Sequence, residues 1–384
     1  MKSFPLPAAL VLALALLCGT ARAQVAAPAL AARSWLLVDV TSGQVLAAND
    51  ADARVEPASL TKLMTAYVVF GALREKRIAP ELRPPVSQRA WKAIGSRMFI
   101  DPARPASVDE LLRGMIIQSG NDASIALAEA VAGSEDAFAQ LMNREAQRMG
   151  LANTQFRNST GLPDPQHYSS ARDLATLTAR LIADFPENYA LYSHKEYTYN
   201  GIRQPNRNRL LFLDPSVDGV KTGHTDAAGF CLIASSRRPQ PGADFQRRLL
   251  SVVLGAGTEA ARAIESQKLL NFGFQNFDAM KLFGKAVPAG TYPLWKGTAD
   301  QVQAGFDADV VVTVPKGQAS SVKAEIERVQ PLVAPIVQGQ RIGTLRVRLG
   351  ERVLAERPVL ALAGVEQAGL LGRAWDTIRL WMNK

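Results

Sequence analysis

The sequence is poor in the side chains on which several common enzyme chemistries depend. Its 384 residues include three histidines and two cysteines, and no pair of histidines has the spacing of metal ligands on one helical face. This disfavours a zinc peptidase and predicts neither a metal nor a cofactor. No serine stands in a Gly-x-Ser-x-Gly sequence, which excludes the nucleophile elbow of the α/β-hydrolases.

The amino terminus has no apolar run long enough to cross a bilayer. The run from Ala8 to Leu17 follows a positive start and precedes Ala21-Arg22-Ala23, an Ala-x-Ala cleavage sequence. Residues 1–23 are therefore predicted to be a secretory signal peptide. Cleavage leaves Cys231 as the single cysteine, so no internal disulfide can form. Its apolar neighbours predict a small buried side chain.

Positive charge exceeds negative charge along the chain. Removal of the signal peptide takes away Lys2 and Arg22 and lowers the formal net charge from +9 to +7. A basic surface on an exported protein suits an anionic lipid or an anionic wall polymer. Export disfavours nucleic acid as a partner.

Length and pattern predict two domains and a tail. Residues 24–276 begin with a strand hairpin, continue with helices and end with strands and a helix, which predicts an α+β fold with an antiparallel sheet. Residues 277–363 are predicted to form a small all-β domain. The predicted elements of the first domain are strands Ser34–Val40, Gln44–Ala48, Val217–Thr225, Phe230–Ser235 and Arg248–Leu254, and helices starting at Ser59, Ser107, Asp122, Ser134, Ser170 and Glu259.

The sequence also predicts the burial or exposure of some side chains outside these elements. Residues 71–106 are rich in proline and are predicted to form a loop region anchored by Trp91 and Phe99. His167 and His194 stand in polar segments and are expected on the surface.

The most informative short motif is Ser59-Leu60-Thr61-Lys62. A serine and a lysine three residues apart lie on one helical face. The lysine can activate the serine hydroxyl if its pKa falls from ~10.4 to roughly 7–8, through burial or a second cation. Alone, the pattern is common by chance and favours an exposed serine that caps a helix.

Two further motifs follow in order, Ser119-Gly120-Asn121 and Lys221-Thr222-Gly223-His224-Thr225. The set resembles the penicillin-recognising serine acyltransferases, with their S-x-x-K, S-x-N and K-T-G elements, over about residues 30–275. With the small β domain and the tail, the chain is similar to the low-molecular-mass penicillin-binding proteins, the D-alanyl-D-alanine carboxypeptidases. This resemblance implies a β-lactamase/transpeptidase-like fold with an all-helical subdomain beside the sheet.

The resemblance also implies a role for each motif residue. Ser59 would form an acyl-enzyme with a peptidoglycan pentapeptide ending in D-Ala-D-Ala, or with a β-lactam. Lys62 would be the base and Ser119 a proton relay. The substrate-binding residues would be Asn121, Lys221, Thr222, Gly223, His224 and Thr225. His224 would act through its backbone N–H, which with that of Ser59 would form the oxyanion hole.

Three alternative functions fit parts of this pattern less well. A class A β-lactamase has Asp where Gly120 stands, and it uses a loop glutamate that residues 158–169 lack. A DD-endopeptidase of the same fold usually lacks the second domain. A wall-binding module without catalysis would need a broken motif, and all three motifs are intact.

Residues 364–384 are predicted to be an amphipathic helix on a membrane surface. Leu371, Trp375, Ile378 and Met382 recur with helical spacing, and basic residues flank this stripe. The segment is too charged to span a bilayer but can lie in the interface. We therefore expect a periplasmic protein, peripheral on the outer face of the inner membrane. The alternative is a helix packed against the protein's own β domain.

Overall fold

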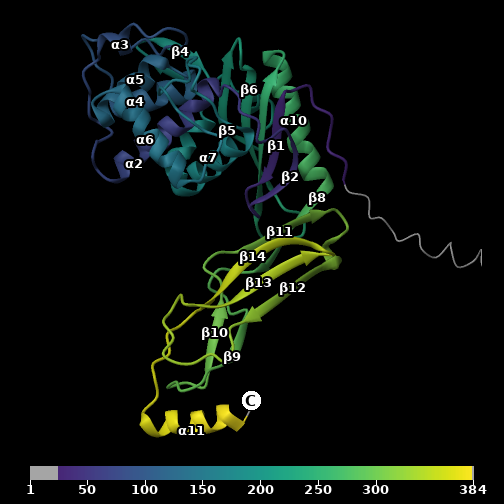
Figure 1. Cartoon of the computed structure of the whole chain (residues 1–384). Coiled ribbons are helices and arrows are strands. Elements are labelled where there is room, and N and C mark those ends of the chain that lie inside the picture. The colour runs from purple at the N-terminus through teal and green to yellow at the C-terminus, as the bar shows by residue number, and fades with distance from the viewer. Residues whose placement is uncertain (1–24, 383–384) are drawn as a thin grey trace, which may run out of the picture.

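The computed structural model describes residues 25–382, so the predicted signal peptide lies outside the described residues. Two sheet-containing units lie end to end (Figure 1). A helical region flanks the first unit, and helix α11 lies at the far end of the second. No helix among the described residues is long and apolar enough to cross a membrane.

The first sheet has five antiparallel strands in the order β2-β1-β7-β6-β5. Because β1 lies between its hairpin partner β2 and the distant β7, the two ends of the domain close one sheet, as the element order predicted. The predicted α+β class is therefore confirmed. The strands are β1 (Ser34–Asp39), β2 (Gln44–Asn49), β5 (Val217–Thr225), β6 (Gly229–Pro239) and β7 (Gln246–Ala256).

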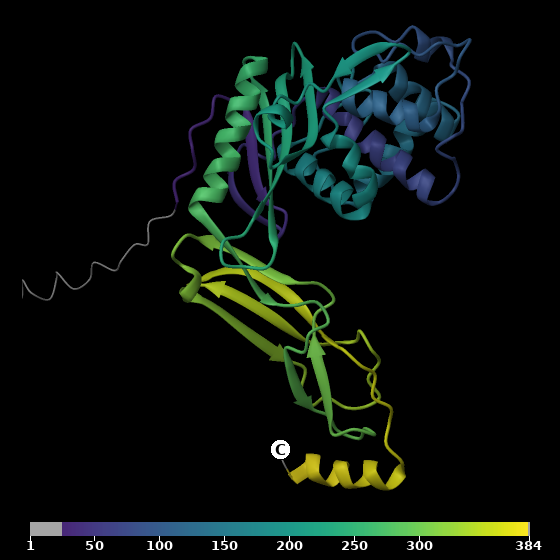
Figure 2. The same ribbon diagram turned by 180° about the vertical axis from the view of Figure 1, so that it is seen from behind.

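Helices cover both faces of this sheet. Helix α10 (Glu259–Asn276) lies on one face and the helical region on the other (Figure 2). Ser107, Ser134 and Ser170 cap helices at the predicted starts, and Ser107 forms a complete capping box with Glu110. The remaining helices are α2 (Lys62–Arg74), α3 (Gln88–Trp91), α4 (Val108–Arg113), α5 (Asn121–Ala132), α6 (Glu135–Arg148), α7 (Ala171–Asp184), α8 (Pro186–Tyr189) and α9 (Leu210–Leu213).

Shorter elements connect these helices. A 3₁₀ turn (Ala58–Thr61) leads into α2, and a π-helical turn (Gly114–Gln118) extends α4. A second 3₁₀ turn (Ala190–Ser193) precedes the hairpin of β3 (Glu196–Tyr199) and β4 (Ile202–Pro205).

Two expectations about side-chain burial were wrong. Trp91 and Phe99 are 47% and 46% exposed, so they do not anchor their loop by packing. His167 is 3% exposed, because its ring hydrogen-bonds to the Thr61 hydroxyl under the 3₁₀ turn. His194 is exposed and Cys231 is buried, as predicted.

The second unit has its own apolar core and consists of strands, as predicted. Its main sheet has the order β12-β13-β14-β10-β9, and a separate pair joins β11 to β8. A 3₁₀ turn (Ala319–Ser321) precedes β12. The strands are β8 (Phe277–Phe283), β9 (Gly290–Pro293), β10 (Gln301–Gly305), β11 (Val310–Pro315), β12 (Val322–Arg328), β13 (Arg341–Leu349) and β14 (Arg352–Ala361).

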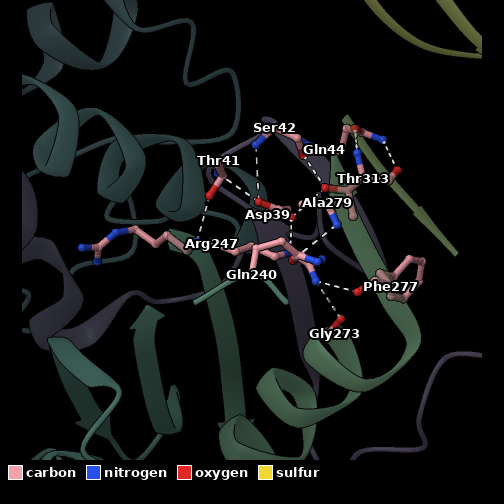
Figure 3. Close-up of polar contacts among 11 residues, drawn as sticks. Asp39, Thr41, Ser42, Gln44, Gln240, Arg247, Gly273, Phe277, Ala279 and Thr313 are labelled. Atoms are coloured by element: carbon pink, nitrogen blue, oxygen red, sulfur yellow. Dashed lines mark hydrogen bonds and ion pairs between the residues drawn. The ribbon is translucent and has the colours of Figure 1, made fainter. Parts of the chain in front are cut away.

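A buried polar network joins the two units (Figure 3). The Asp39 carboxylate forms an ion pair with Arg247 at 2.6 Å and accepts a hydrogen bond from the Thr313 hydroxyl at 2.7 Å. Thr313 and Gln44 exchange two more bonds through the Thr313 backbone. Arg247 also donates to the Phe277 carbonyl at 2.7 Å. The β1–β2 hairpin is therefore tied directly to β11.

Helix α11 (Leu370–Met382) contacts the second unit through polar groups. The Asp376 carboxylate accepts from the Lys296 backbone N–H at 2.6 Å, and the Arg379 guanidinium lies 5.6 Å from the Trp295 ring centroid. Its large apolar side chains remain exposed, namely Leu370, Trp375, Ile378, Trp381 and Met382.

Candidate active site

Ser59 lies in the 3₁₀ turn at the entrance to α2. The preceding Ala58 has a φ of +48°, a left-handed conformation that costs about 1–3 kcal/mol in a residue with a Cβ. Gly161 packs so closely on this turn that an added Cβ would lie 1.8 Å from the Ala58 carbonyl oxygen. The half-buried Ser59 side chain is thus held by surrounding backbone at the cleft surface.

Lys62 begins α2 directly beneath Ser59. Its ammonium nitrogen lies 2.9 Å from Ser59 Oγ, 2.7 Å from Asn121 Oδ1 and 2.7 Å from the Thr160 carbonyl oxygen. The side chain is 1% exposed. Burial, followed by the positive charge of Arg207, lowers the pKa of Lys62 from 10.5 to about 7.

These partners determine where a neutral Lys62 directs its lone pair. A neutral amine has two N–H donors, and both carbonyl oxygens can only accept. The Asn121 amide is oriented because its Nδ2 donates to the Ile94 carbonyl at 2.7 Å. Once Asn121 and Thr160 accept the two hydrogens, the lone pair faces the Ser59 hydroxyl. This arrangement can remove the serine proton.

A buried carboxylate fixes the carbonyl of Thr160. Glu135 accepts hydrogen bonds from the backbone N–H and the hydroxyl of Ser159, at 2.9 and 2.6 Å. Asn158 Oδ1 accepts from the Thr160 and Gly161 N–H groups. The loop that supplies one partner of Lys62 is therefore held at both ends.

Ser119 follows the π-helical turn and has a φ of +68°. Its Oγ is buried and has no hydrogen-bond partner within the described residues, although the residue lines the cleft. An unpaired buried hydroxyl costs about 1–3 kcal/mol. The site therefore contains a strained serine whose hydroxyl can bond to a molecule in the cleft.

Strand β5 supplies the opposite wall. It is the edge strand of the sheet, so one side of its backbone is free to pair with an extended ligand. Lys221 and Thr222 are 3% and 5% exposed. Burial, followed by the charge of Lys62, lowers the pKa of Lys221 well below its usual value. The two lysines are thus electrostatically coupled beneath the cleft.

The other residues of this strand differ in their roles. An added Cβ on Gly223 would meet the Pro57 carbonyl at 3.1 Å and Ala58 Cβ at 3.2 Å, so this glycine lets β5 pack against the 3₁₀ turn. His224 is exposed and its ring lies 4.1 Å from the Phe230 ring centroid. The Thr225 hydroxyl donates to Glu56 at 3.0 Å.

All three motifs meet at one cleft of about 620 Å³. Its lining includes Ser59, Ser119, Asn121 and the segment 222–225, with Lys62 and Lys221 beneath. Within residues 25–382, no group of three or more His, Cys, Asp or Glu side chains could hold a metal ion.

Two arginines in the cleft were missed by the sequence analysis. Arg207 stands in a polar loop, where no periodicity distinguishes it. Arg262 is 5% exposed and shares a face of α10 with the buried Leu269 and Gly273, a spacing that could have revealed it. Together with Lys221 they make the cleft basic, and Glu259 is the acidic residue of its lining.

Comparisons with known proteins agree along the chain. A family described as D-alanyl-D-alanine carboxypeptidase matches residues 21–258, and one described as penicillin-binding protein 5, C-terminal domain, matches residues 277–367. The D-alanyl-D-alanine carboxypeptidase DacC of Escherichia coli (strain K12) is 43% identical over 365 residues, which are 93% of this chain and 90% of the relative.

Solved structures are similar as well. Penicillin-binding protein 5 from Haemophilus influenzae is 40% identical, with a TM-score of 0.83 over 89% of this chain and 100% of that one. Penicillin-binding protein D2 from Listeria monocytogenes, solved in an ampicillin-bound form, is 30% identical, with a TM-score of 0.59 over 65% of this chain and 99% of that one.

Proposed function

The chain belongs to the D-alanyl-D-alanine carboxypeptidase family, and we propose that Ser59 is the nucleophile with which it removes the terminal D-alanine from peptidoglycan pentapeptides. The observation that carries this proposal is the environment of Lys62, a buried amine 2.9 Å from Ser59 Oγ whose other two partners can only accept hydrogens.

The first half of the reaction forms an acyl-enzyme. Lys62 takes the proton of Ser59 as Oγ bonds to the carbonyl carbon between the two D-alanines. The backbone N–H groups of Ser59 and His224 stabilise the oxyanion, where each donor contributes ~2.7–4 kcal/mol. The C–N bond then breaks, and the Ser119 hydroxyl relays the proton to the leaving amine.

Deacylation reverses the proton movements. Water attacks the ester carbonyl and loses its proton to the base, and Ser59 Oγ leaves with a proton. The products are free D-alanine and a tetrapeptide, so atoms and charge balance over the cycle.

The terminal carboxylate of the substrate lies against the basic wall. Thr222 donates its hydroxyl to the carboxylate, and Arg207 supplies positive charge. We assign a smaller role to the Thr225 hydroxyl than the sequence suggested, because it already donates to Glu56. The edge of β5 binds the peptide backbone.

A β-lactam reacts at the same serine and is not turned over rapidly. The ampicillin-bound form of penicillin-binding protein D2, a protein of similar structure, supports β-lactam binding. The absence of a glutamate in residues 158–169 and the presence of Gly120 argue against a β-lactamase.

We further propose that the protein is exported and rests on the outer face of the inner membrane through α11. The exposed apolar side chains of α11 would enter the anionic interface, while Asp376 faces the second unit. Removing residues 365–384 should release the protein from membranes with penicillin binding intact. Retention on the membrane would contradict the anchor, and unfolding would favour a helix packed on the β domain.

The decisive experiment measures D-alanine release from a D-Ala-D-Ala pentapeptide. The purified protein should release it and Ser59→Ala should not. A wild-type protein that instead cleaves a cross-linked dimer, with little release from the pentapeptide, would be an endopeptidase. Rapid turnover of penicillin without an adduct would indicate a β-lactamase.

A further inference from the structure

A short loop beside the catalytic cleft exposes several large apolar side chains. Trp91, the last residue of α3, is 47% exposed, and in the loop that follows, Ile94 is 70% exposed and Phe99 is 46% exposed. Large apolar side chains grouped on an exposed loop are typical of a binding surface.

Asn121 of the second motif and the adjacent Asp122 hold the backbone of this loop. The Asn121 N–H donates to the Ser96 carbonyl at 2.7 Å, and the Asn121 side chain donates to the Ile94 carbonyl. The carboxylate of Asp122, which is 1% exposed, accepts hydrogen bonds from the backbone N–H groups of Met98, Phe99 and Ile100. The exposed side chains therefore project from a fixed backbone.

Phe99 combines exposure with backbone strain. Its φ of +68° is rare for a bulky residue and strains the backbone. Burial of the ring does not offset this strain, because the ring is exposed. The Arg97 guanidinium lies 5.0 Å from the ring centroid. Arg97 makes no hydrogen bond or ion pair within residues 25–382, so its N–H donors are available. An aromatic face beside free donors suits a ligand with both apolar C–H faces and hydroxyl groups.

The location of the loop limits what this ligand can be. Gly95 and Ser96 line the catalytic cleft, and one amide group separates the Ile94 carbonyl from Lys62. Three residues precede the D-Ala-D-Ala pair of a pentapeptide and span about 10 Å when extended. The group attached to the amino terminus of the peptide can therefore lie near this loop. The loop region near α3 also lies at the opposite end of the molecule from α11 (Figure 1), which disfavours lipid as its partner.

We propose that this loop binds the carbohydrate to which the pentapeptide is attached, with a sugar ring against Phe99 and Ile94 and its hydroxyl groups bonded to Arg97. This inference rests on the proposed carboxypeptidase function. It makes Phe99 and Ile94 specificity residues for the linked substrate, with no part in the chemistry at Ser59.

The test compares two substrates that share one peptide. One is the free pentapeptide, and the other is the same peptide with the wall disaccharide on its amino terminus. The wild-type protein should have the higher kcat/KM for the disaccharide-linked form. Phe99→Asn removes the ring and keeps a residue that tolerates the left-handed backbone. It should lower kcat/KM for the linked substrate about 5-fold, mainly through KM, and leave the free peptide within about 2-fold.

A matched pair of isoleucines supplies the control. Ile94→Asn should reduce the preference for the linked substrate. Ile264→Asn should not, because Ile264 is 52% exposed on α10 and points away from the face that carries Arg262. Urea unfolding of all three variants checks that each is folded.

Each outcome decides a different question. Equal kcat/KM for the two substrates in the wild-type protein would overturn the carbohydrate site. An equal loss on both substrates in Phe99→Asn would mean that the loop only positions the second motif. Vesicle binding that depends on Phe99 would replace carbohydrate with lipid. If the wild-type protein releases D-alanine from neither substrate, the proposed function itself fails.

Discussion

Replacing Lys62 with methionine should abolish acylation and at the same time stabilise the protein near neutral pH. Lys62 is 1% exposed, and its pKa falls from 10.5 to about 7. At ~1.36 kcal/mol per pKa unit, keeping this amine buried costs about 5 kcal/mol at pH 7 or below. Methionine leaves two carbonyl oxygens without donors, at about 1.5 kcal/mol each. The net gain in the free energy of unfolding is on the order of 2 kcal/mol.

The pH dependence gives this prediction its sign. Because the pKa of Lys62 is lower in the folded protein, the unfolded chain binds more protons between pH 7 and 10.5. The destabilising effect of burying Lys62 is therefore absent above pH 10.5, the pKa of Lys62 in the unfolded chain, and it grows as pH falls toward 7. The wild-type free energy of unfolding should therefore gain up to ~1.36 kcal/mol per pH unit from Lys62 in this range. The methionine variant lacks this gain, so its advantage should disappear near pH 9.

Urea unfolding at pH 6, 7.5 and 9, followed by circular dichroism and tryptophan fluorescence, measures both proteins. Lys92→Met is the control, because Lys92 is exposed and its replacement should change stability little at any pH. A Lys62→Met protein that is less stable than the wild type by the same amount at every pH would refute the reasoning. Lys62 would then be charged and paired in the folded state, and it could not be the base.

Three other perturbations test separate parts of the structure. Ser59→Ala should prevent the single mass increase that penicillin produces in intact-mass analysis, whereas an adduct elsewhere would contradict the assignment. Arg207→Gln removes a cation that lowers the pKa of Lys62, so the pH profile of penicillin acylation should move to higher pH; an unchanged profile would leave burial as the sufficient cause. Thr313→Val leaves the buried Asp39 with one donor fewer. It should lower the free energy of unfolding by about 1–3 kcal/mol in urea titrations, and an unchanged value would mean that the contact does not stabilise the joint.

The sequence predicted the features that local chemistry determines. Ser107, Ser134 and Ser170 cap helices because a side-chain oxygen satisfies an N–H that the helix leaves free. The proximity of Ser59 and Lys62 follows from one helical turn. The closure of the sheet by β1 and β7 followed from the order of the elements.

Features that depend on contacts between distant residues could not be predicted in this way. Trp91 and Phe99 looked like buried anchors because large aromatic side chains usually pack in the core. Their loop is fixed instead by the carboxylate of Asp122, through backbone N–H groups that every residue possesses. His167 was placed on the surface because its neighbours are polar, but the Thr61 hydroxyl 106 residues away gives its ring a buried partner.

The joint between the two units illustrates the same limit and has a consequence for the cleft. Asp39 Oδ1 accepts from the Thr41 and Ser42 N–H groups, and Oδ2 accepts from Arg247 and Thr313. Arg247 and Thr313 lie 208 and 274 residues from Asp39 in the sequence, so no periodic pattern reveals them. Tilting the second unit would withdraw Thr313 from a carboxylate that is fully buried. Losing this bond costs about 1–3 kcal/mol, which reduces tilted conformations roughly 5- to 150-fold. The β1–β2 hairpin is thereby held on β11, and the same sheet carries the cleft at its other edge, on β5. The joint therefore disfavours tilting of the second unit relative to the sheet that carries the cleft.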